Sequence, residues 1–193
     1  MTRLDEAVRA AIARWPNVPA VFGWLALTAR GEWRIRGERI ENRALREFIG
    51  RNYAADSKGR WFFQNGPQRV FVDLEVTPWV YRLAPGEGLA THTGVHPRFL
   101  HTAGFLDDGR FLLTTDLGAG LVDDRDAALF LRAVTDFAGL PLNERGLERW
   151  FEGKDEAFVD ATTLKLAAPA CRIERLRTVD LPGRFGFERA PRE

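Results

Sequence analysis

The strongest constraint on the fold is the segment 68–76, in which apolar residues alternate with others. Every second residue from Val70 to Val76 is aliphatic, which is the period of a β-strand that buries one face. The turn sequence Asn-Gly-Pro at residues 65–67 precedes this segment, and residues 60–64 before it are rich in aromatic side chains. The pattern predicts two strands joined by a short loop, the basic unit of an antiparallel sheet.

Similar local patterns recur along the chain. Two further hairpins are predicted around Arg30-Gly31 and around the Asp-Asp-Gly sequence at residues 107–109. A separate strand is predicted after Pro78. Helices are predicted over residues 4–15, 42–53, 123–139 and 143–153, and late strands over residues 157–166 and 171–179.

The predicted helices carry start and stop signals. An apolar stripe formed by Leu4, Val8, Ile12 and Trp15 is ended by Pro16. Asn42 is placed to cap the second helix. Asp123 or Asp124 caps the third, which would run to Gly139.

Together these elements predict an α+β protein. Its sheets are mostly antiparallel, curved and built from hairpins, with helices packed on one face. The Pro-Gly-Glu-Gly sequence at residues 85–88 interrupts the pattern and marks a boundary. We therefore expect an N-terminal α+β half over residues 1–84 and a C-terminal α+β half over residues 85–193, forming either one compact domain or two.

Composition limits the classes of function. The 28 basic and 27 acidic residues give a formal net charge of +1, which provides no electrostatic reason to expect a nucleic-acid or anionic-membrane partner. The N-terminus lacks the apolar core of a signal peptide, and no apolar run is long enough to span a bilayer. We expect a soluble cytoplasmic protein. Ser57 and Cys171 are the single serine and cysteine, and neither has the surroundings of a nucleophile, so no catalytic residue is assigned.

All three histidines of the chain, His92, His96 and His101, fall within eleven residues. Zinc proteases place two histidines four residues apart on one helix, with a glutamate directly after the first. Gly94 and Pro97 disfavour a helix here, and no glutamate follows His92. The three histidines could therefore hold a divalent metal only if this segment is a strand or a loop. Asp73 or Glu75 would then be the carboxylate ligand.

The segment from Pro85 to His92 resembles the start of the cupin signature, in which a Pro-Gly turn precedes a metal-binding histidine. That signature has a second histidine two residues later, where this chain has Thr93 and Gly94. The glutamate and the later histidine of the cupins are also absent. The resemblance therefore implies no cofactor.

The plainest interpretation is that the histidines lie in and around a polar loop between two sheets. A ligand pocket is the third interpretation of this region. Trp79 and Tyr81 would form its floor, and His92, His96 and Arg98 its rim. Apolar walls with a few convergent polar groups are typical of small-molecule sites.

Residues Gly31 to Leu83 resemble a family of uncharacterised bacterial domains of unknown function. The resemblance is carried by structural positions, namely Gly31, Trp33, Gly37, Ile40, Leu45, Gly59, Trp61, Val76, Pro78 and Val80. The hairpin departs from the family pattern, because Asn-Gly-Pro stands where the family has a threonine-proline turn. The resemblance implies a small two-part α+β protein of Proteobacteria with a sensing or regulatory role, and it implies no catalytic residues.

The sequence thus favours a non-catalytic cytoplasmic module that binds a small molecule or a protein, or that has a regulatory or sensing role. The main alternative is a metal-dependent enzyme that uses His92, His96 and His101. A homodimeric scaffold without a small ligand is the remaining alternative. The identity of the ligand stays open.

Overall fold

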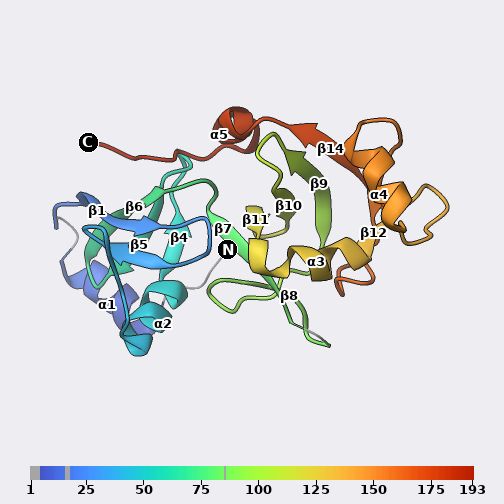
Figure 1. Cartoon of the computed structure of the whole chain (residues 1–193). Coiled ribbons are helices and arrows are strands. Elements are labelled where there is room, and N and C mark those ends of the chain that lie inside the picture. The colour runs from blue at the N-terminus through green and yellow to red at the C-terminus, as the bar shows by residue number, and fades with distance from the viewer. Residues whose placement is uncertain (1–4, 16–17, 85) are drawn as a thin grey trace. The chain divides into compact units, whose positions relative to one another are not determined.

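The computed structural model of the chain describes residues 5–15, 18–84 and 86–193 (Figure 1). Leu4, Pro16 and Pro85, which entered the sequence predictions, lie outside the described residues. The chain groups into two compact units. Unit 1 consists of the described residues within 1–78, 92–94 and 179–193. Unit 2 consists of the described residues within 79–91 and 95–178. Whether residues 1–84 and 85–193 are folding domains stays a prediction, because this grouping does not test independent folding.

Unit 1 is built on a sheet with the strand order β3-β2-β1-β6-β5-β4. Figure 1 shows α1 and α2 on the same side of this sheet. The strands are β1 (Val21–Leu27), β2 (Trp33–Ile35), β3 (Glu38–Arg39), β4 (Tyr53–Ala55), β5 (Trp61–Asn65) and β6 (Gln68–Leu74). The helices are α1 (Glu6–Arg14), α2 (Arg43–Arg51) and α5 (Leu181–Phe185).

The alternation that predicted β6 builds the core of unit 1. In the pairing of β1 with β6, Leu25 lies beside Val72 and Leu27 beside Leu74, and all four side chains are buried. Each buried aliphatic side chain of this size contributes about 1.5–3 kcal/mol to folding. The predicted hairpins between β1 and β2 and between β5 and β6 are confirmed.

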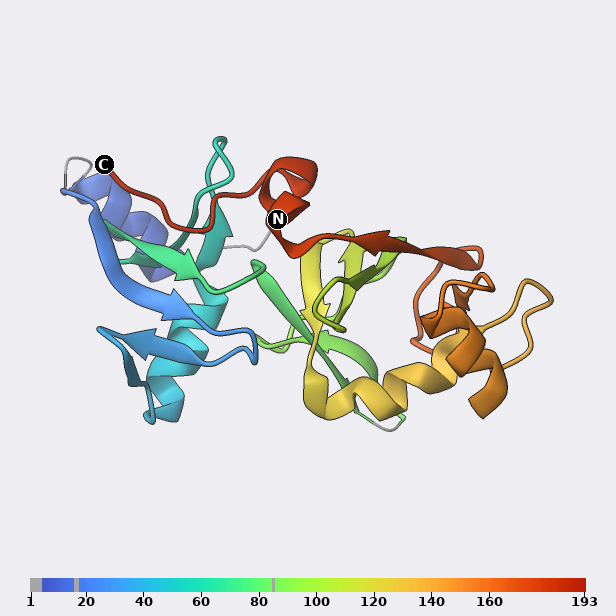
Figure 2. The ribbon, with the colours of Figure 1, turned by 45° about the horizontal axis from the view of Figure 1, so that its top comes forward.

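Helix α2 begins where the sequence predicts. The side chain of Asn42 accepts a hydrogen bond from the backbone N–H of Leu45, at 3.0 Å, and so caps the helix. On the sheet-facing side of α2, Phe48 meets Phe63 of β5 edge to face, with ring centroids 5.4 Å apart. Figure 2 shows α2 next to the strands of unit 1 that it covers.

Unit 2 contains a second sheet with the order β12-β13-β14-β9-β10-β11-β7-β8. Its strands are β7 (Trp79–Ala84), β8 (Gly88–Thr91), β9 (Leu100–Leu106), β10 (Phe111–Thr115), β11 (Gly118–Val122), β12 (Val134–Thr135), β13 (Phe158–Val159) and β14 (Cys171–Leu176). Its helices are α3 (Ala127–Phe130) and α4 (Glu144–Phe151), and the short 3-10 turns of the chain are η1 (Asp124–Asp126), η2 (Leu131–Ala133) and η3 (Thr178–Asp180).

An aromatic cluster joins the helices of unit 2 to its sheet. Phe105 of β9 and Phe111 of β10 are paired neighbours, with ring centroids 5.1 Å apart. Phe130 of α3 lies 4.7 Å from Phe111, and Trp150 of α4 lies 5.0 Å from Phe105. Aromatic pairs at these separations add about 0.5–1.5 kcal/mol each beyond their area burial, so the cluster holds both helices on one face.

The prediction of one long helix over residues 123–139 is wrong. Asp123 caps the segment as expected, because its side chain accepts from the N–H of Arg125. The helical turns then end at Ala133, and β12 follows and pairs with β13. Val134 and Thr135 are β-branched, which favours a strand over a helix.

The predicted α+β class with mostly antiparallel sheets is confirmed. Among the described residues, three pairings between the named strands are parallel: β1 with β6, β7 with β11, and β9 with β14. Each parallel pairing joins strands that are far apart in the sequence, so no turn sequence predicts the pairing.

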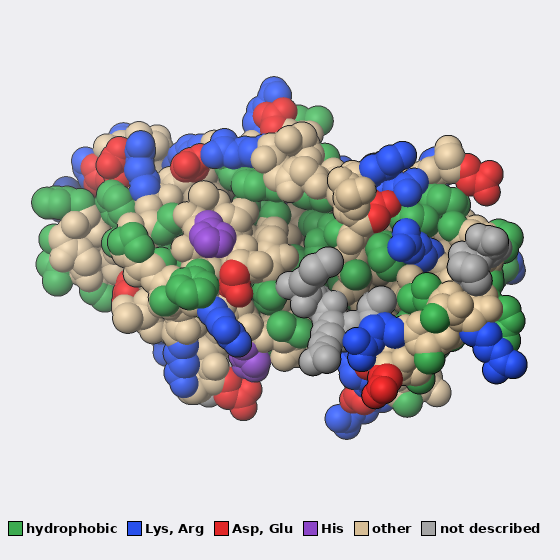
Figure 3. Space-filling model, turned by 180° about the vertical axis from the view of Figure 1, so that it is seen from behind, with side chains coloured by type: hydrophobic (Ala, Val, Ile, Leu, Met, Phe, Trp, Pro, Cys, Tyr) green, Lys and Arg blue, Asp and Glu red, His purple; other side chains and the backbone are tan. Residues whose placement is uncertain are grey.

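The surface carries both signs of charge. Figure 3 shows basic and acidic side chains interspersed on one face of the molecule. Exposed ion pairs such as Arg43–Glu47, at 2.7 Å, are part of this pattern. Within the described ranges, every helix is too short or too polar to cross a membrane.

Candidate functional site

The two aromatic residues predicted to floor a pocket belong to the core of unit 2. Trp79 is 1% exposed and Tyr81 is fully buried. Nε1 of Trp79 donates to the carbonyl of Leu117 at 2.7 Å, and the Tyr81 hydroxyl lies 2.8 Å from both Thr115 Oγ1 and the carbonyl of Gly118. Burial raises the pKa of Tyr81 above its usual value. Their role in ligand binding stays a prediction, and the structure shows them packing the sheet.

His92 belongs to unit 1. Its ring lies 5.3 Å from the ring of Trp33 and 5.9 Å from that of Tyr53. Burial of the imidazole lowers the pKa of His92 to about 3, because a low-dielectric environment disfavours the charged form. The imidazole is therefore neutral at physiological pH.

The other predicted residues belong to unit 2. His96 is exposed, and its Nδ1 lies 3.0 Å from the carbonyl of Leu89. Arg98 is exposed, and its backbone N–H donates to Asp116 at 2.8 Å. His101 is exposed on β9.

The structure gives no support to the metal hypothesis. Among the described residues, no group of three His, Cys, Asp or Glu side chains is arranged to hold a metal ion. The two candidate carboxylates are engaged elsewhere in unit 1. Asp73 pairs with Arg192 at 2.7 Å, and Glu75 accepts from the backbone N–H of Ala29 at 2.9 Å.

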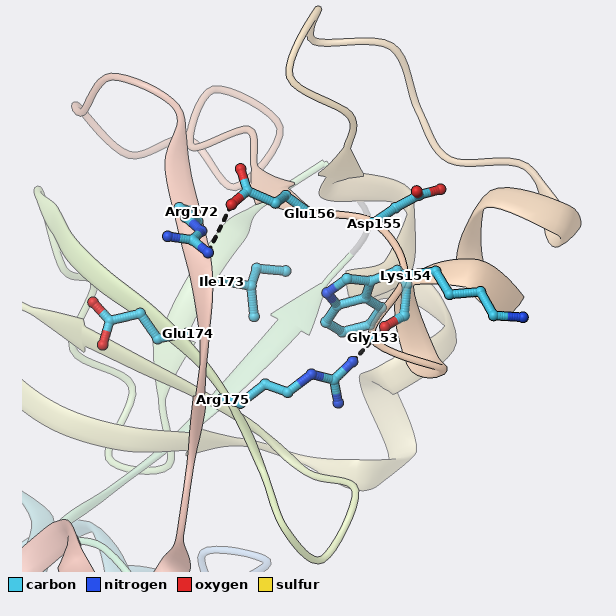
Figure 4. Close-up of a pocket in the computed structure, with 9 residues that line it drawn as sticks. Gly153, Lys154, Asp155, Glu156, Arg172, Ile173, Glu174 and Arg175 are labelled. Atoms are coloured by element: carbon cyan, nitrogen blue, oxygen red, sulfur yellow. Dashed lines mark hydrogen bonds and ion pairs between the residues drawn. The ribbon is translucent and has the colours of Figure 1, made fainter.

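A cleft of about 430 Å³ opens in unit 2 between β14 and the turn that follows α4. This volume falls within the range of small-molecule sites, about 300–1,000 Å³. Residues 172–175 of β14 form one wall, residues 153–156 the other, and Trp150 also lines the cleft. In Figure 4, Ile173 and Arg175 extend from β14 toward this turn, whereas Glu174 points to the opposite side. The two-residue period of the strand therefore places an apolar and a cationic side chain together.

Arg175 is held at a fixed place in the cleft. Its Nη2 donates to the backbone carbonyls of Trp150 and Phe151 at the end of α4. Arginine near a helix C-terminus satisfies carbonyls that the helix leaves unpaired. The guanidinium carbon lies 5.5 Å from the centroid of the Trp150 ring and 5.6 Å from that of Phe105.

No acidic side chain among the described residues pairs with Arg175. The neighbouring charges are paired with one another: Arg172 with Glu156 at 2.7 Å, as Figure 4 shows, and Arg149 with Asp155 at 2.7 Å. Arginine has five N–H donors, and the two carbonyls occupy only those of Nη2. The cleft therefore places beside an aromatic ring a cation whose Nε and Nη1 donors bond to no residue that the structure describes.

Sequence reasoning missed Arg175 and Trp150. They are 25 residues apart, and each sits in a local pattern that indicates only a helix or a strand. Arg175 alternates with Ile173, which is buried, and this is the one local sign that the arginine faces the apolar side of β14.

A comparison with protein families supplies the wider context. The family model DUF2944, described as "Protein of unknown function (DUF2946)", matches residues 4–192. The chain belongs to the DUF2944 family. The resemblance to a family of unknown function is thus confirmed, and the match to DUF2944 extends far beyond Gly31 to Leu83.

The description of this family names no activity. No curated protein matches the sequence. Among solved structures, the chain is similar to a DUF1285 family protein from Silicibacter pomeroyi DSS-3. The TM-score is 0.46 at 16% identity, over 76% of this chain and 100% of that one.

Proposed function

We propose that the protein is a non-catalytic module that binds a small molecule in the cleft of unit 2. The observation that carries the proposal is the guanidinium of Arg175, which is fixed by two carbonyls and lies beside Trp150 without an acidic partner among the described residues. A planar guanidinium of this kind suits a carboxylate or phosphate group. Trp150 and Ile173 line the same cleft, and the small exposed parts of these two mostly buried side chains are its apolar contribution.

The predicted cellular setting belongs to the same proposal. We expect the module to act in the cytoplasm, on a small molecule and without nucleic acid or membrane, in keeping with its net charge of +1. A regulatory or sensing role, a protein partner and a homodimer stay predictions.

A thermal-shift screen tests the proposal. A ligand that binds only the folded protein raises its stability by RT ln(1 + [L]/Kd), which is about 2.7 kcal/mol at a hundredfold excess over Kd. The panel consists of small aromatic and heterocyclic carboxylates and phosphates, each with an uncharged analogue. We expect stabilisation by one or more anions and little by the analogues.

Two variants locate the effect. Arg175→Gln should abolish the stabilisation, whereas Arg145→Gln removes an equal charge from an exposed position of α4 and should retain it, since Arg145 does not line the cleft. The melting temperature of each variant without ligand separates a loss of binding from a loss of folding. A panel without any stabilising anion, or an equal response from Arg175→Gln, would refute the proposal.

A further inference from the structure

A second pocket, of about 250 Å³, lies wholly within unit 1, between α2 and strands β1, β2, β5 and β6. Its lining is almost entirely aliphatic and aromatic, and Asn65 and Gln68 are the polar residues. A buried apolar cavity of about 150 Å³ in another protein accommodates benzene. The pocket of unit 1 is open to solvent and somewhat larger, so a small ring or a short alkyl chain fits it.

Three apolar side chains of this pocket are unusually exposed. Trp24 is 50% exposed, Ile35 40% and Leu45 37%. They come from β1, β2 and α2 and line the same space. Exposed apolar side chains that cluster around a concavity indicate a binding site rather than ordinary surface.

Arg36 lies next to this pocket in a conformation that arginine rarely adopts. Ile35 of β2 pairs with Glu38 of β3, so Arg36 and Gly37 form a two-residue hairpin loop. Their φ angles are 50° and 87°. A type I′ turn requires positive φ at both central positions and favours Asn-Gly, because a Cβ at positive φ crowds the backbone. Arg36 thus occupies the turn position at which asparagine is the preferred residue.

The side chain of Arg36 has a defined position despite its exposure. Its guanidinium carbon lies 3.8 Å from the centroid of the Trp24 ring, and its backbone N–H donates to the Trp24 carbonyl at 2.8 Å. Within the described part of the chain, Arg36 forms no ion pair with an acidic side chain. By contrast, Arg34 and Arg39 on the same hairpin both pair with Glu32.

We propose that the pocket of unit 1 binds a small monocarboxylate with an apolar body, either a short alkyl chain or one aromatic ring. Trp24, Ile35 and Leu45 enclose the body, and the guanidinium of Arg36 pairs with the carboxylate at the rim. The negative charge of the carboxylate complements the Arg36 cation, and the volume of the pocket limits the size of the apolar body. This site is separate from the cleft of unit 2 and involves none of its residues.

Hexanoate and hexanamide are the probes, because they share an alkyl chain and differ in charge. Their binding to the full chain is followed by titration in two-dimensional amide NMR, which also shows which residues respond. We expect hexanoate to bind at least tenfold more tightly than hexanamide and to shift the resonances of residues 21–70.

Arg36→Asn is the decisive variant, because asparagine suits the turn better than arginine does. We expect it to fold at least as stably as the wild type and to lose the preference for hexanoate, so that both probes bind equally. Arg39→Asn removes the same charge from the same hairpin and should keep the preference. Leu45→Gln changes the apolar wall on α2 and should weaken both probes.

Three results of the affinity measurements would overturn this proposal. They are equal affinities of the two probes for the wild type, a preference for hexanoate that survives in Arg36→Asn, and binding of neither probe up to its solubility limit. Resonance shifts confined to residues 150–175 would place hexanoate in the cleft of unit 2 and would also reject a carboxylate site in unit 1.

Discussion

Asp123→Asn should destabilise the fold of unit 2. The carboxylate is fully buried at the start of η1, where it accepts hydrogen bonds from the backbone N–H, Nε and Nη2 of Arg125 at 3.0, 2.8 and 2.5 Å. Nε of Arg82 lies 3.4 Å away. Asparagine keeps the shape but loses the charge that faces both guanidinium groups.

The size of the effect follows from these contacts. Removing one partner of a buried ion pair commonly costs about 3–5 kcal/mol, because the other charge is left buried. Here the side chains of Arg82 and Arg125 are 43% and 46% exposed, so water solvates them after the substitution. Arg82 also keeps Asp126 at 2.6 Å, and asparagine remains a good N-cap. The expected loss is therefore about 2–3 kcal/mol, or roughly 5–10 °C in melting temperature for a chain of this size.

The loss should depend on pH in a defined direction. Burial alone would raise the pKa of the Asp123 carboxyl, but the side-chain and backbone hydrogen bonds from Arg125 outweigh it, and the pKa lies below its ordinary value. A carboxyl whose pKa is lowered by folding stabilises the protein above its unfolded pKa of about 3.9. That stability disappears as the pH falls through the folded value. The difference between wild type and variant should be constant from about pH 5 to 8 and shrink below about pH 4.

Urea denaturation followed by tryptophan fluorescence measures this difference at pH 7 and at pH 3. Asp124→Asn is the matched control, because this exposed residue of the same turn should change stability by no more than about 0.5 kcal/mol. The reasoning is refuted if Asp123→Asn stays within about 0.5 kcal/mol of the wild type at pH 7. An equal difference at pH 7 and pH 3 would also refute it.

The remaining predictions concern close packing. Gly120→Ala should cost about 2 kcal/mol or more, because the added Cβ would lie 2.5 Å from Cε2 of Tyr81; wild-type stability in urea would contradict this. Tyr81→Phe should cost about 1–2 kcal/mol by removing the buried hydroxyl that bonds Thr115, and a cost below half of that in thermal melting would count against it. Gly59→Ala combines a φ of 76° with a clash against the carbonyl of Gly186. It should speed proteolysis of the C-terminal segment, and an unchanged cleavage rate would show that this contact is unimportant.

The sequence predicts elements that depend on neighbouring residues. The hairpins at residues 30–31, 65–67 and 107–109 carry their turn residues between two apolar segments, so their pairing is a local property. The caps at Asn42 and Asp123 are equally local. Such features need no knowledge of the rest of the fold.

Features that depend on distant residues could not be predicted in this way. The parallel pairing of β9 with β14 brings Ala103 beside Ile173, and no pattern within either strand specifies its partner. The helix predicted over residues 123–139 fails for the same reason, because β12 exists through its pairing with β13. Tertiary pairing there overrides the helix signals of the preceding residues.

The histidine segment crosses the division between the two units. His92 belongs to unit 1, whereas His96 belongs to unit 2, although only three residues separate them. The cleft beside Arg175 lies within unit 2 and is formed by residues that are distant in sequence. Trp150 and Arg175 are 25 residues apart, yet the guanidinium carbon lies 5.5 Å from the centroid of the Trp150 ring. A site assembled from two elements becomes visible only when the fold brings those elements together.

Part of the pocket of unit 1 can be recognised in the sequence, because one residue beside it departs from the usual composition of a hairpin turn. A two-residue hairpin loop ending in glycine normally begins with asparagine, aspartate or glycine, and this chain has Arg36 there. Sequences that fold well agree with their structure at each level, and exceptions concentrate where function requires a particular side chain. The proposed binding site would explain this exception, because the Arg36 guanidinium lies over the exposed ring of Trp24, which lines the pocket. If Arg36→Asn both raises the stability of the protein and abolishes carboxylate binding, then arginine is present at this strained turn position because the binding site requires its charge.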